Sequence, residues 1–297
     1  MSVDELRGDP DEPESGDDLG RDAPAAAHGD TEAVRECPEP RSRTEYAADL
    51  ERQVVERDAL LRFEPRNAGL PEVSTTDGMA YLEKHHAERP WLAVARDCQP
   101  EVQRVFAALD QGGGHAHIRH EGWATEEMNE RRLRFLEDPA QLDPARRVAG
   151  VDGLVPGDKP HRCGSTVTRI TSPDAFAVAV AMSARHPDVR AALEAEFKAK
   201  QAPHPVVLPI ADVLGPDGHR FCSGWKLEPV DGDMKAALAH RDKWATQRRD
   251  GIPGEAQPAI RPVETFDGGT MTFMFGPNRA RDGYEIVTMC LNPPVDH

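Results

Sequence analysis

The chain changes character at about residue 43, and this change most constrains what can fold. Residues 1–43 combine clustered Asp and Glu with several Pro and Gly and few aromatic or β-branched residues. Such a segment cannot bury enough apolar area to offset its conformational entropy. The sequence therefore predicts a disordered acidic tail over residues 1–43 and confines stable structure to residues 44–297.

The net charge of −16 is concentrated in the same tail. Residues 1–50 hold fifteen Asp or Glu and five Lys or Arg, so 37 of the 52 acids and 31 of the 36 bases lie after them. The remaining chain is nearly balanced and lacks the basic field that drives non-specific nucleic-acid binding. Any chemistry on a nucleic acid must therefore use local cations, and no DNA partner is expected.

Cysteine spacing and hydropathy indicate the compartment. The five cysteines are widely spaced, without a CxxC pair, which is unlike a disulfide framework and fits a reducing compartment. The first residues, MSVDELRGDPDEP, are acidic where a Sec signal needs a basic region, and no stretch has about 18 uninterrupted apolar residues. We expect no membrane partner, and a cytoplasmic protein or one exported without a Sec signal.

The periodicity of residues 44–110 predicts a helical subregion. Apolar residues of TEYAADLERQVVERDALLR recur near one helix face, with charges elsewhere. Asp77 can cap a helix over GMAYLEKHH, and Pro100 occupies a first-turn position before EVQRVFAAL.

Strand and helix patterns alternate after residue 111 and predict an α+β fold. STVTRIT (residues 165–171) has strand composition, and Ser172 followed by Pro173 can open a helix through DAFAVAVAMSA. Two apolar runs flank Pro216-Asp217-Gly218, which predicts a hairpin, and TMTFMFG with YEIVTMCL predicts a closing hairpin. We expect helices packed on a curved antiparallel sheet in a domain of residues 111–297.

Three histidines, His115, His117 and His120, lie within six positions of the segment GGGHAHIRHEG (residues 112–122). Histidine titrates near neutrality, so in a cleft it can transfer protons or bind a metal. A polar loop without chemistry is an equally good interpretation of such a cluster.

Three arginines follow in the helix TEEMNERRLRF, which Thr125 can cap. The planar guanidinium suits phosphate, so one of Arg131, Arg132 and Arg134 could serve the histidines. For two of the three, pairing with nearby glutamates on a solvated face is the preferred interpretation.

Strict alternation in the last strand puts Thr288 and Cys290 on one face. A hydroxyl on a concave sheet face can hold a substrate oxygen, although a strand threonine is usually ordinary β-forming material.

Taken together, GGGHAHIRHEG, TEEMNERRL, TVTRITSPDAFAVAVA and YEIVTMCLNP resemble the ribonuclease A-like toxin domain of bacterial contact-dependent inhibition and other polymorphic toxins. In that family a Gly-Gly-His-x-x-x-x-His segment leads into an acid-rich helix with an Arg, and the final strand ends in Thr-x-Tyr-Pro. The resemblance covers roughly residues 112–292 in scattered motifs. Residues 200–262 look like an insertion, and Cys290 stands where the family has Tyr.

The resemblance implies metal-independent RNA cleavage without a cofactor, and a cognate immunity protein as a partner. Matched by motif, His115 and His120 are the two histidines, Arg132 is the helix arginine and Thr288 the strand threonine. The expected roles are His120 as base or acid, Arg132 as phosphate clamp and Thr288 as a donor. The second proton carrier stays open among His115, His117 and, as a weaker candidate, Cys290.

Two other hypotheses compete with the nuclease. HRC (residues 161–163), HRFC (residues 219–222) and the HAHIRH histidines could converge on zinc, although neither Cys motif has a known zinc spacing. Alternatively the chain is a non-enzymatic interaction module, with the acidic tail and the helices of residues 44–110 as docking elements.

Overall fold

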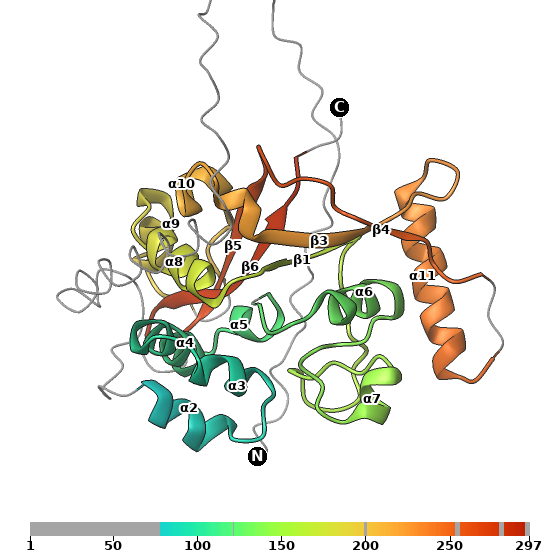
Figure 1. Ribbon diagram of the computed structural model, residues 1–297, viewed down its shortest axis with the longest axis horizontal. Coiled ribbons are helices and arrows are strands. Elements are labelled where there is room, and N and C mark those ends of the chain that lie inside the picture. Colours follow the sequence, from blue (N-terminus) through green and yellow to red (C-terminus); the bar gives the residue numbers. More distant parts are fainter. Residues whose placement is uncertain (1–77, 121, 199–200, 253–255, 279–281, 295–297) are drawn as a thin grey trace, which may run out of the picture. The chain divides into compact units, whose positions relative to one another are not determined.

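The computed structural model describes residues 78–120, 122–198, 201–252, 256–278 and 282–294, all within the unit formed by residues 41–297. The predicted tail (residues 1–43), the first part of the helical subregion (residues 44–77) and the Asp77 cap lie outside these residues. What is described is an α+β fold (Figure 1).

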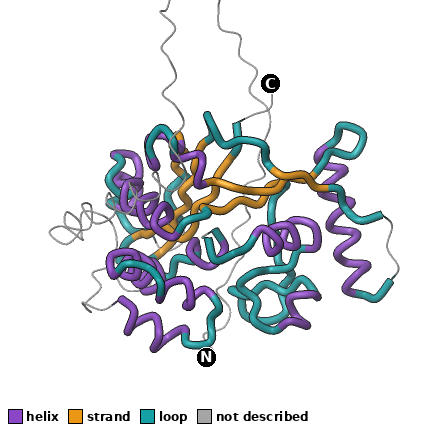
Figure 2. Tube along the Cα trace, viewed as in Figure 1, coloured by secondary structure: helices purple, strands orange, loops and turns teal. Residues whose placement is uncertain are grey.

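In the described part of the chain, six strands form two three-stranded antiparallel sheets, and the strands are drawn in orange in Figure 2. The first sheet has the order β1-β3-β4. Its strands are β1 (Thr166–Ile170), β3 (Cys222–Leu227) and β4 (Ile260–Pro262). The second sheet has the order β2-β5-β6. Its strands are β2 (Val206–Pro209), β5 (Thr270–Pro277) and β6 (Tyr284–Asn292). The expected α+β class is confirmed, with the antiparallel strands divided between two sheets.

The two sheets meet where β1 lies beside β6. The Thr168 hydroxyl donates to the Leu291 carbonyl oxygen at 3.2 Å and accepts from the Leu291 N–H at 3.1 Å. A single buried side chain thus joins a strand of each sheet, and the candidate site lies at this junction.

Helices surround the sheets. The chain first forms α2 (Gly78–His86), α3 (Trp91–Arg96), α4 (Pro100–Gly112), α5 (Ala116–Arg119), α6 (Glu126–Phe135) and α7 (Pro144–Val148). The later helices are α8 (Pro173–Ser183), α9 (Pro187–Leu193), α10 (Ile210–Leu214), the 3-10 turn η2 (Gly218–Phe221) and α11 (Met234–Arg249). None of the described helices has the length and apolar character that crossing a membrane requires.

Several local predictions are confirmed. Thr125 caps α6 by accepting from the Met128 N–H, Ser172 caps α8 by accepting from the Ala175 N–H, and Pro100 opens α4. Residues 175–181 of α8 are all buried, which explains why this helix is apolar on every face.

The predicted hairpin around Pro216-Asp217-Gly218 is wrong. The first apolar run continues from β2 into α10, where Ile210, Val213 and Leu214 bury one helical face. The turn therefore connects α10 to η2, and β2 and β3 belong to different sheets. The segment 200–262 also supplies β3, the central strand of the first sheet, together with α11, which packs against α6 and β3 (Figure 1).

The closing hairpin is confirmed, with an irregularity that the sequence did not predict. β5 and β6 pair antiparallel, but the register shifts between Met274, opposite Thr288, and Phe275, opposite Ile286. Val287 is therefore a bulge residue, and strict alternation does not extend across it. Thr288 and Cys290 both lie beyond the bulge and share one face of β6, as expected.

Candidate active site

His120 ends α5 and is held by the free edge of β1. Its carbonyl oxygen accepts from the Ile170 N–H at 2.9 Å, and its ring Nδ1 lies 3.1 Å from the Thr168 carbonyl oxygen. A carbonyl oxygen only accepts hydrogen bonds, so Nδ1 carries the proton and Nε2 keeps a free lone pair. The ring is thereby prepared to accept a proton at Nε2.

The glycine run positions His115 against β6. Gly113 ends α4 with a φ of 104°, and a Cβ at Gly114 would lie 2.8 Å from the Ile286 carbonyl oxygen. Only glycine allows the loop to approach β6 so closely. The His115 N–H then donates to the Val287 carbonyl oxygen at 2.8 Å, which fixes the His115 backbone against β6 at the residue before Thr288.

Thr288 and Cys290 contribute the β6 side of the site. The Thr288 hydroxyl oxygen is buried and has no hydrogen-bond partner among the described residues. Cys290 lines a small pocket with His120 and Thr168, which is too tight to hold a water molecule. Burial raises the pKa of the Cys290 thiol, so this group is protonated at neutral pH.

Arg132 is the charged centre of the site. It lies on the buried face of α6 at 6% exposure, and its Nη1 is buried without a partner in the described part of the chain. Burial lowers the pKa of both His115, to about 4, and His120, and the charge of Arg132 lowers both further. The same charge acts on Cys290. His115, His120 and Cys290 are thus each within electrostatic reach of Arg132, and Thr288 shares the β6 face of Cys290.

A buried network behind Arg132 was missed by sequence reasoning. Arg132 Nε lies 3.2 Å from His161 Nε2, and His161 Nδ1 lies 3.1 Å from an Asp152 carboxylate oxygen. Arg119 bridges Asp152 and Asp138 through ion pairs of 2.8 and 2.5 Å. The five residues are spread over positions 119 to 161, so no motif spacing could have identified them.

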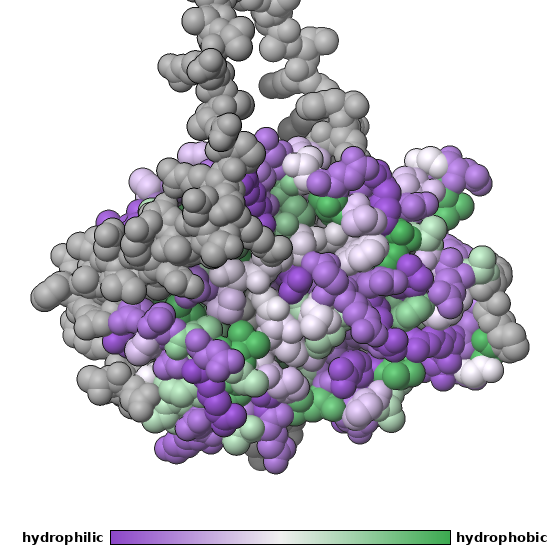
Figure 3. Space-filling model, in the orientation of Figure 1, coloured by the Kyte–Doolittle hydropathy of each residue, from purple (hydrophilic) through white to green (hydrophobic). Residues whose placement is uncertain are grey.

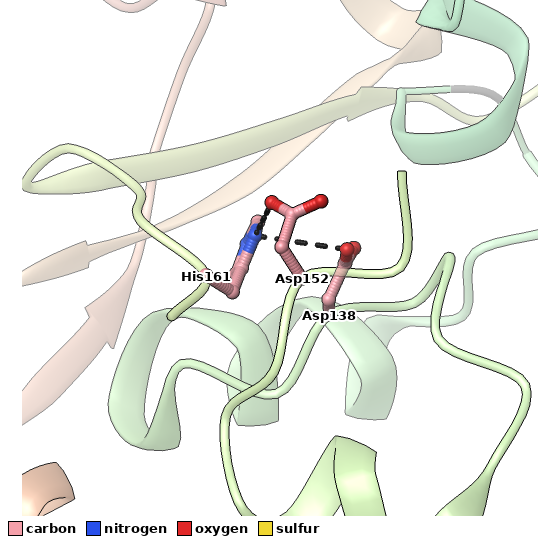
Figure 4. A group of neighbouring side chains, drawn as sticks. All are labelled: Asp138, Asp152 and His161. Atoms are coloured by element: carbon pink, nitrogen blue, oxygen red, sulfur yellow. Dashed lines mark hydrogen bonds and ion pairs between the residues drawn. The ribbon is translucent and has the colours of Figure 1, made fainter. Parts of the chain in front are cut away.

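Asp138, Asp152 and His161 hold potential ligand atoms within 4.8 Å of one another (Figure 4). A metal there would have to displace Arg119, which already supplies the positive charge. Each carboxylate also accepts backbone N–H bonds, Asp138 from Gly153 and Asp152 from Leu154. The group is therefore best explained as an ion-pair network.

The cysteines of the zinc hypothesis have separate surroundings. Cys163 Sγ lies against the Arg132 carbonyl oxygen and the Arg241 guanidinium, whereas Cys222 Sγ contacts the Gly218 carbonyl oxygen. A thiol facing arginine is poorly placed to share a zinc ion with histidine.

His117 is a packing residue. Its ring is 1% exposed, lies edge-on to Trp91 and stacks on Phe106. Burial lowers its pKa to about 4, so the ring is neutral at physiological pH. His117 is thereby placed in the core rather than with the other two histidines.

The neighbouring arginines of α6 pair with glutamates as expected, although Glu137 is buried rather than on a solvated face. Arg131 pairs with Glu137 at 2.7 Å, and Arg134 pairs with Glu130 at 3.1 Å.

One turn before Arg132, by contrast, Asn129 is fully buried, and both polar atoms of its amide have no partner among the described residues. This unpaired amide is a further feature that the sequence did not single out.

Neither the protein-family models, nor the curated proteins, nor the solved structures contain a match to this chain.

Proposed function

We propose that this chain is a metal-independent endoribonuclease of the ribonuclease A-like toxin type. The observation that carries the proposal is the buried Arg132, whose Nη1 has no partner among the described residues and whose charge acts on His115, His120 and Cys290. A buried guanidinium with an unused donor is suited to bind a phosphate oxygen.

The proposed reaction begins at His120. Its free Nε2 removes the proton from the 2′-hydroxyl of the ribose, and the 2′-oxygen then bonds to the adjacent phosphorus. The bond between phosphorus and the 5′-oxygen breaks as the leaving oxygen takes up a proton. The products are a 2′,3′-cyclic phosphate and a 5′-hydroxyl, so water, metal and oxidant are not consumed in this step.

Arg132 and Thr288 stabilise the pentavalent phosphorus. The guanidinium offsets the negative charge that builds on the non-bridging oxygens, and the Thr288 hydroxyl can donate to one of them. Both groups have a buried polar atom without a partner in the described residues, which supports a role that only substrate completes.

His115 is assigned as the acid for the leaving 5′-oxygen. Its backbone is bonded to Val287, the residue before Thr288 in β6, whereas the ring of His117 is enclosed by Trp91 and Phe106. The Cys290 thiol is the alternative donor, since its raised pKa keeps the proton on sulfur.

The surface suits a substrate held by a few local contacts. On the face drawn in Figure 3, hydrophilic side chains are interspersed with small apolar patches. Because the pocket beside His120 is closed, RNA must displace side chains on binding. The toxin resemblance adds an inhibitory immunity protein as the expected protein partner.

The decisive experiment measures cleavage of a labelled RNA by purified protein, in EDTA, with toxicity on expression in a cell as a second readout. His120→Ala should lower the rate by about 10²- to 10⁴-fold, the usual loss for a general acid or base. His219→Ala, which changes a partly exposed histidine on η2, is the matched control and should cleave normally. If the wild-type protein leaves RNA intact and is harmless, the interaction-module hypothesis replaces this one.

A further inference from the structure

We infer that His161 is a positioning residue that fixes the guanidinium of Arg132 through a chain of hydrogen bonds from Asp152. The role assigned to Arg132 at the phosphate rests on the proposed function. The chain of bonds does not, because it is defined by the geometry of the free protein. Its purpose is to orient the unpaired Nη1 toward the place where substrate binds.

The chemistry of the three groups sets the direction of both bonds. Arg132 Nε can only donate, so His161 Nε2, 3.2 Å away, must accept. The proton of the neutral ring is then on Nδ1, which donates to Asp152 Oδ2 at 3.1 Å. Arg119 Nη2 lies 3.4 Å from the same nitrogen and donates to Asp152 Oδ2 at the shorter distance of 2.8 Å. A carboxylate that fixes the tautomer of a histidine is the arrangement that orients histidines behind many active sites.

The far end of the chain is anchored to the backbone. Asp152 Oδ1 accepts from the N–H groups of Leu154 and Val155 at 2.8 and 3.0 Å, while Oδ2 also accepts from Arg119. The carboxylate cannot rotate without breaking several of these bonds. Because Asp152 is held in this way, His161 is a rigid support for Arg132.

Charge balance favours the neutral ring that the chain requires. Arg119 and Arg132 are offset by Asp138 and Asp152, so the buried group is neutral when His161 is neutral. Protonation of His161 Nε2 would turn it into a donor that faces the Nε–H donor of Arg132, and it would add a third positive charge to the buried group. His161 is 1% exposed, and burial lowers its pKa, which keeps the ring in the accepting form.

Two substitutions at this position separate positioning from packing. His161→Phe keeps the ring volume and removes the acceptor, whereas His161→Gln offers an amide oxygen that can still accept from Arg132. The first measurement is hydrogen exchange of the Arg132 Nε–H by ¹⁵N NMR, with the signal assigned by its loss in Arg132→Lys. We expect slow exchange in the wild type and in His161→Gln, and exchange at least about tenfold faster in His161→Phe.

The second measurement is the rate of RNA cleavage. His161→Phe should lower kcat by about 10- to 100-fold, the loss typical of groups that support a functional side chain, and His161→Gln should recover most of it. Slow exchange together with full cleavage in a folded His161→Phe protein overturns the inference. If wild-type protein does not cleave RNA, the proposed function fails, while the exchange data alone still decide the positioning role.

A thermal melt checks that each variant folds. Where His161→Phe does not fold, Asp152→Asn takes its place. Both carboxylate oxygens of Asp152 accept hydrogen bonds, whereas the side-chain amide of asparagine has only one accepting oxygen. The support of His161 is therefore weakened, and faster exchange at Arg132 Nε is again expected. Unchanged exchange in this variant would equally overturn the inference.

Discussion

The hydroxyl of Thr168 exchanges two hydrogen bonds with the backbone of Leu291, and this reciprocal contact joins the edge of one sheet to a strand of the other. On either side of it lie two residues of the candidate site. His120 is bonded to the Thr168 carbonyl oxygen, and Cys290 precedes Leu291 in β6. The distance between the histidine and the β6 residues therefore depends on Thr168.

Thr168→Val should weaken both the fold and the site. The change keeps the shape of the side chain but leaves the Leu291 N–H and carbonyl groups unpaired, a loss of about 1–3 kcal/mol in the free energy of unfolding. Activity should fall as well, because β1 and β6 are no longer held in register. Urea unfolding and RNA cleavage are the measurements, with Thr166→Val at the partly exposed start of β1 as control. Unaltered stability would show that the contact is not required.

Local sequence rules predicted local structure well. The caps at Thr125 and Ser172 and the proline that opens α4 depend on neighbours within a few residues. The closing hairpin pairs two strands that follow one another in the sequence. The division into two sheets depends on which strands pair over long separations. β1 pairs with β3 and β2 pairs with β5, and such pairing is not encoded in any single segment.

The sequence proposes members for the candidate site but does not indicate what supports them. The family resemblance selects His120, Arg132 and Thr288, and their roles stay predictions. Asp152 and His161 come together only because the loop between α7 and β1 folds back onto α6, which no periodicity indicates. Sequence spacing places His117 with His115 and His120, because spacing alone cannot distinguish a ring that faces Trp91 and Phe106 from one that faces substrate.

Arg132→Ala should lower the rate of RNA cleavage more than Arg132→Lys does. Alanine removes the charge that stabilises the pentavalent phosphorus, so cleavage should fall by about 10²- to 10³-fold, as for other donors to a developing anion. Lysine keeps a charge but lacks the planar fork, so it should restore only part of the rate. Arg134→Ala, at a helix-surface ion pair, is the control and should retain cleavage. Equal rates for the lysine variant and the wild type would contradict the proposed geometry.

Thr288→Val should separate activity from stability. The buried hydroxyl has no partner in the described structure, so a nearly isosteric methyl group should leave the free energy of unfolding unchanged or raise it by about 1 kcal/mol. Cleavage should fall because the phosphate loses a donor. Thermal unfolding and single-turnover cleavage test the two effects. A variant that is both less stable and fully active would exclude the proposed role.

His117 should make the fold sensitive to acid. Its folded pKa of about 4 lies below the unfolded value of 6.5, so the neutral ring stabilises the fold above pH 6.5, and that contribution is lost as the pH falls. The loss from this one group reaches about 2 kcal/mol at pH 5. Urea unfolding at pH 7.5 and pH 5 should show a smaller decrease in His117→Leu than in the wild type. The same decrease in both proteins would assign the effect to other groups.

The dependence of cleavage on pH tests the assignment of His115 as the acid. With its pKa at about 4, only a small fraction of His115 is protonated at pH 7, and that fraction rises about tenfold for each unit of decreasing pH. Burial and Arg132 also lower the pKa of His120 well below its usual value, which favours the deprotonated base. The value of kcat/KM should therefore increase from pH 7 to pH 5, with circular dichroism confirming that the protein remains folded.

His115→Ala should cleave RNA slowly and lose the rise of kcat/KM with decreasing pH, whereas His117→Leu should keep that rise. If the optimum lies above pH 7, or if His115→Ala retains the slope, the proton comes from another group, and the Cys290 thiol is the first to test by Cys290→Ala.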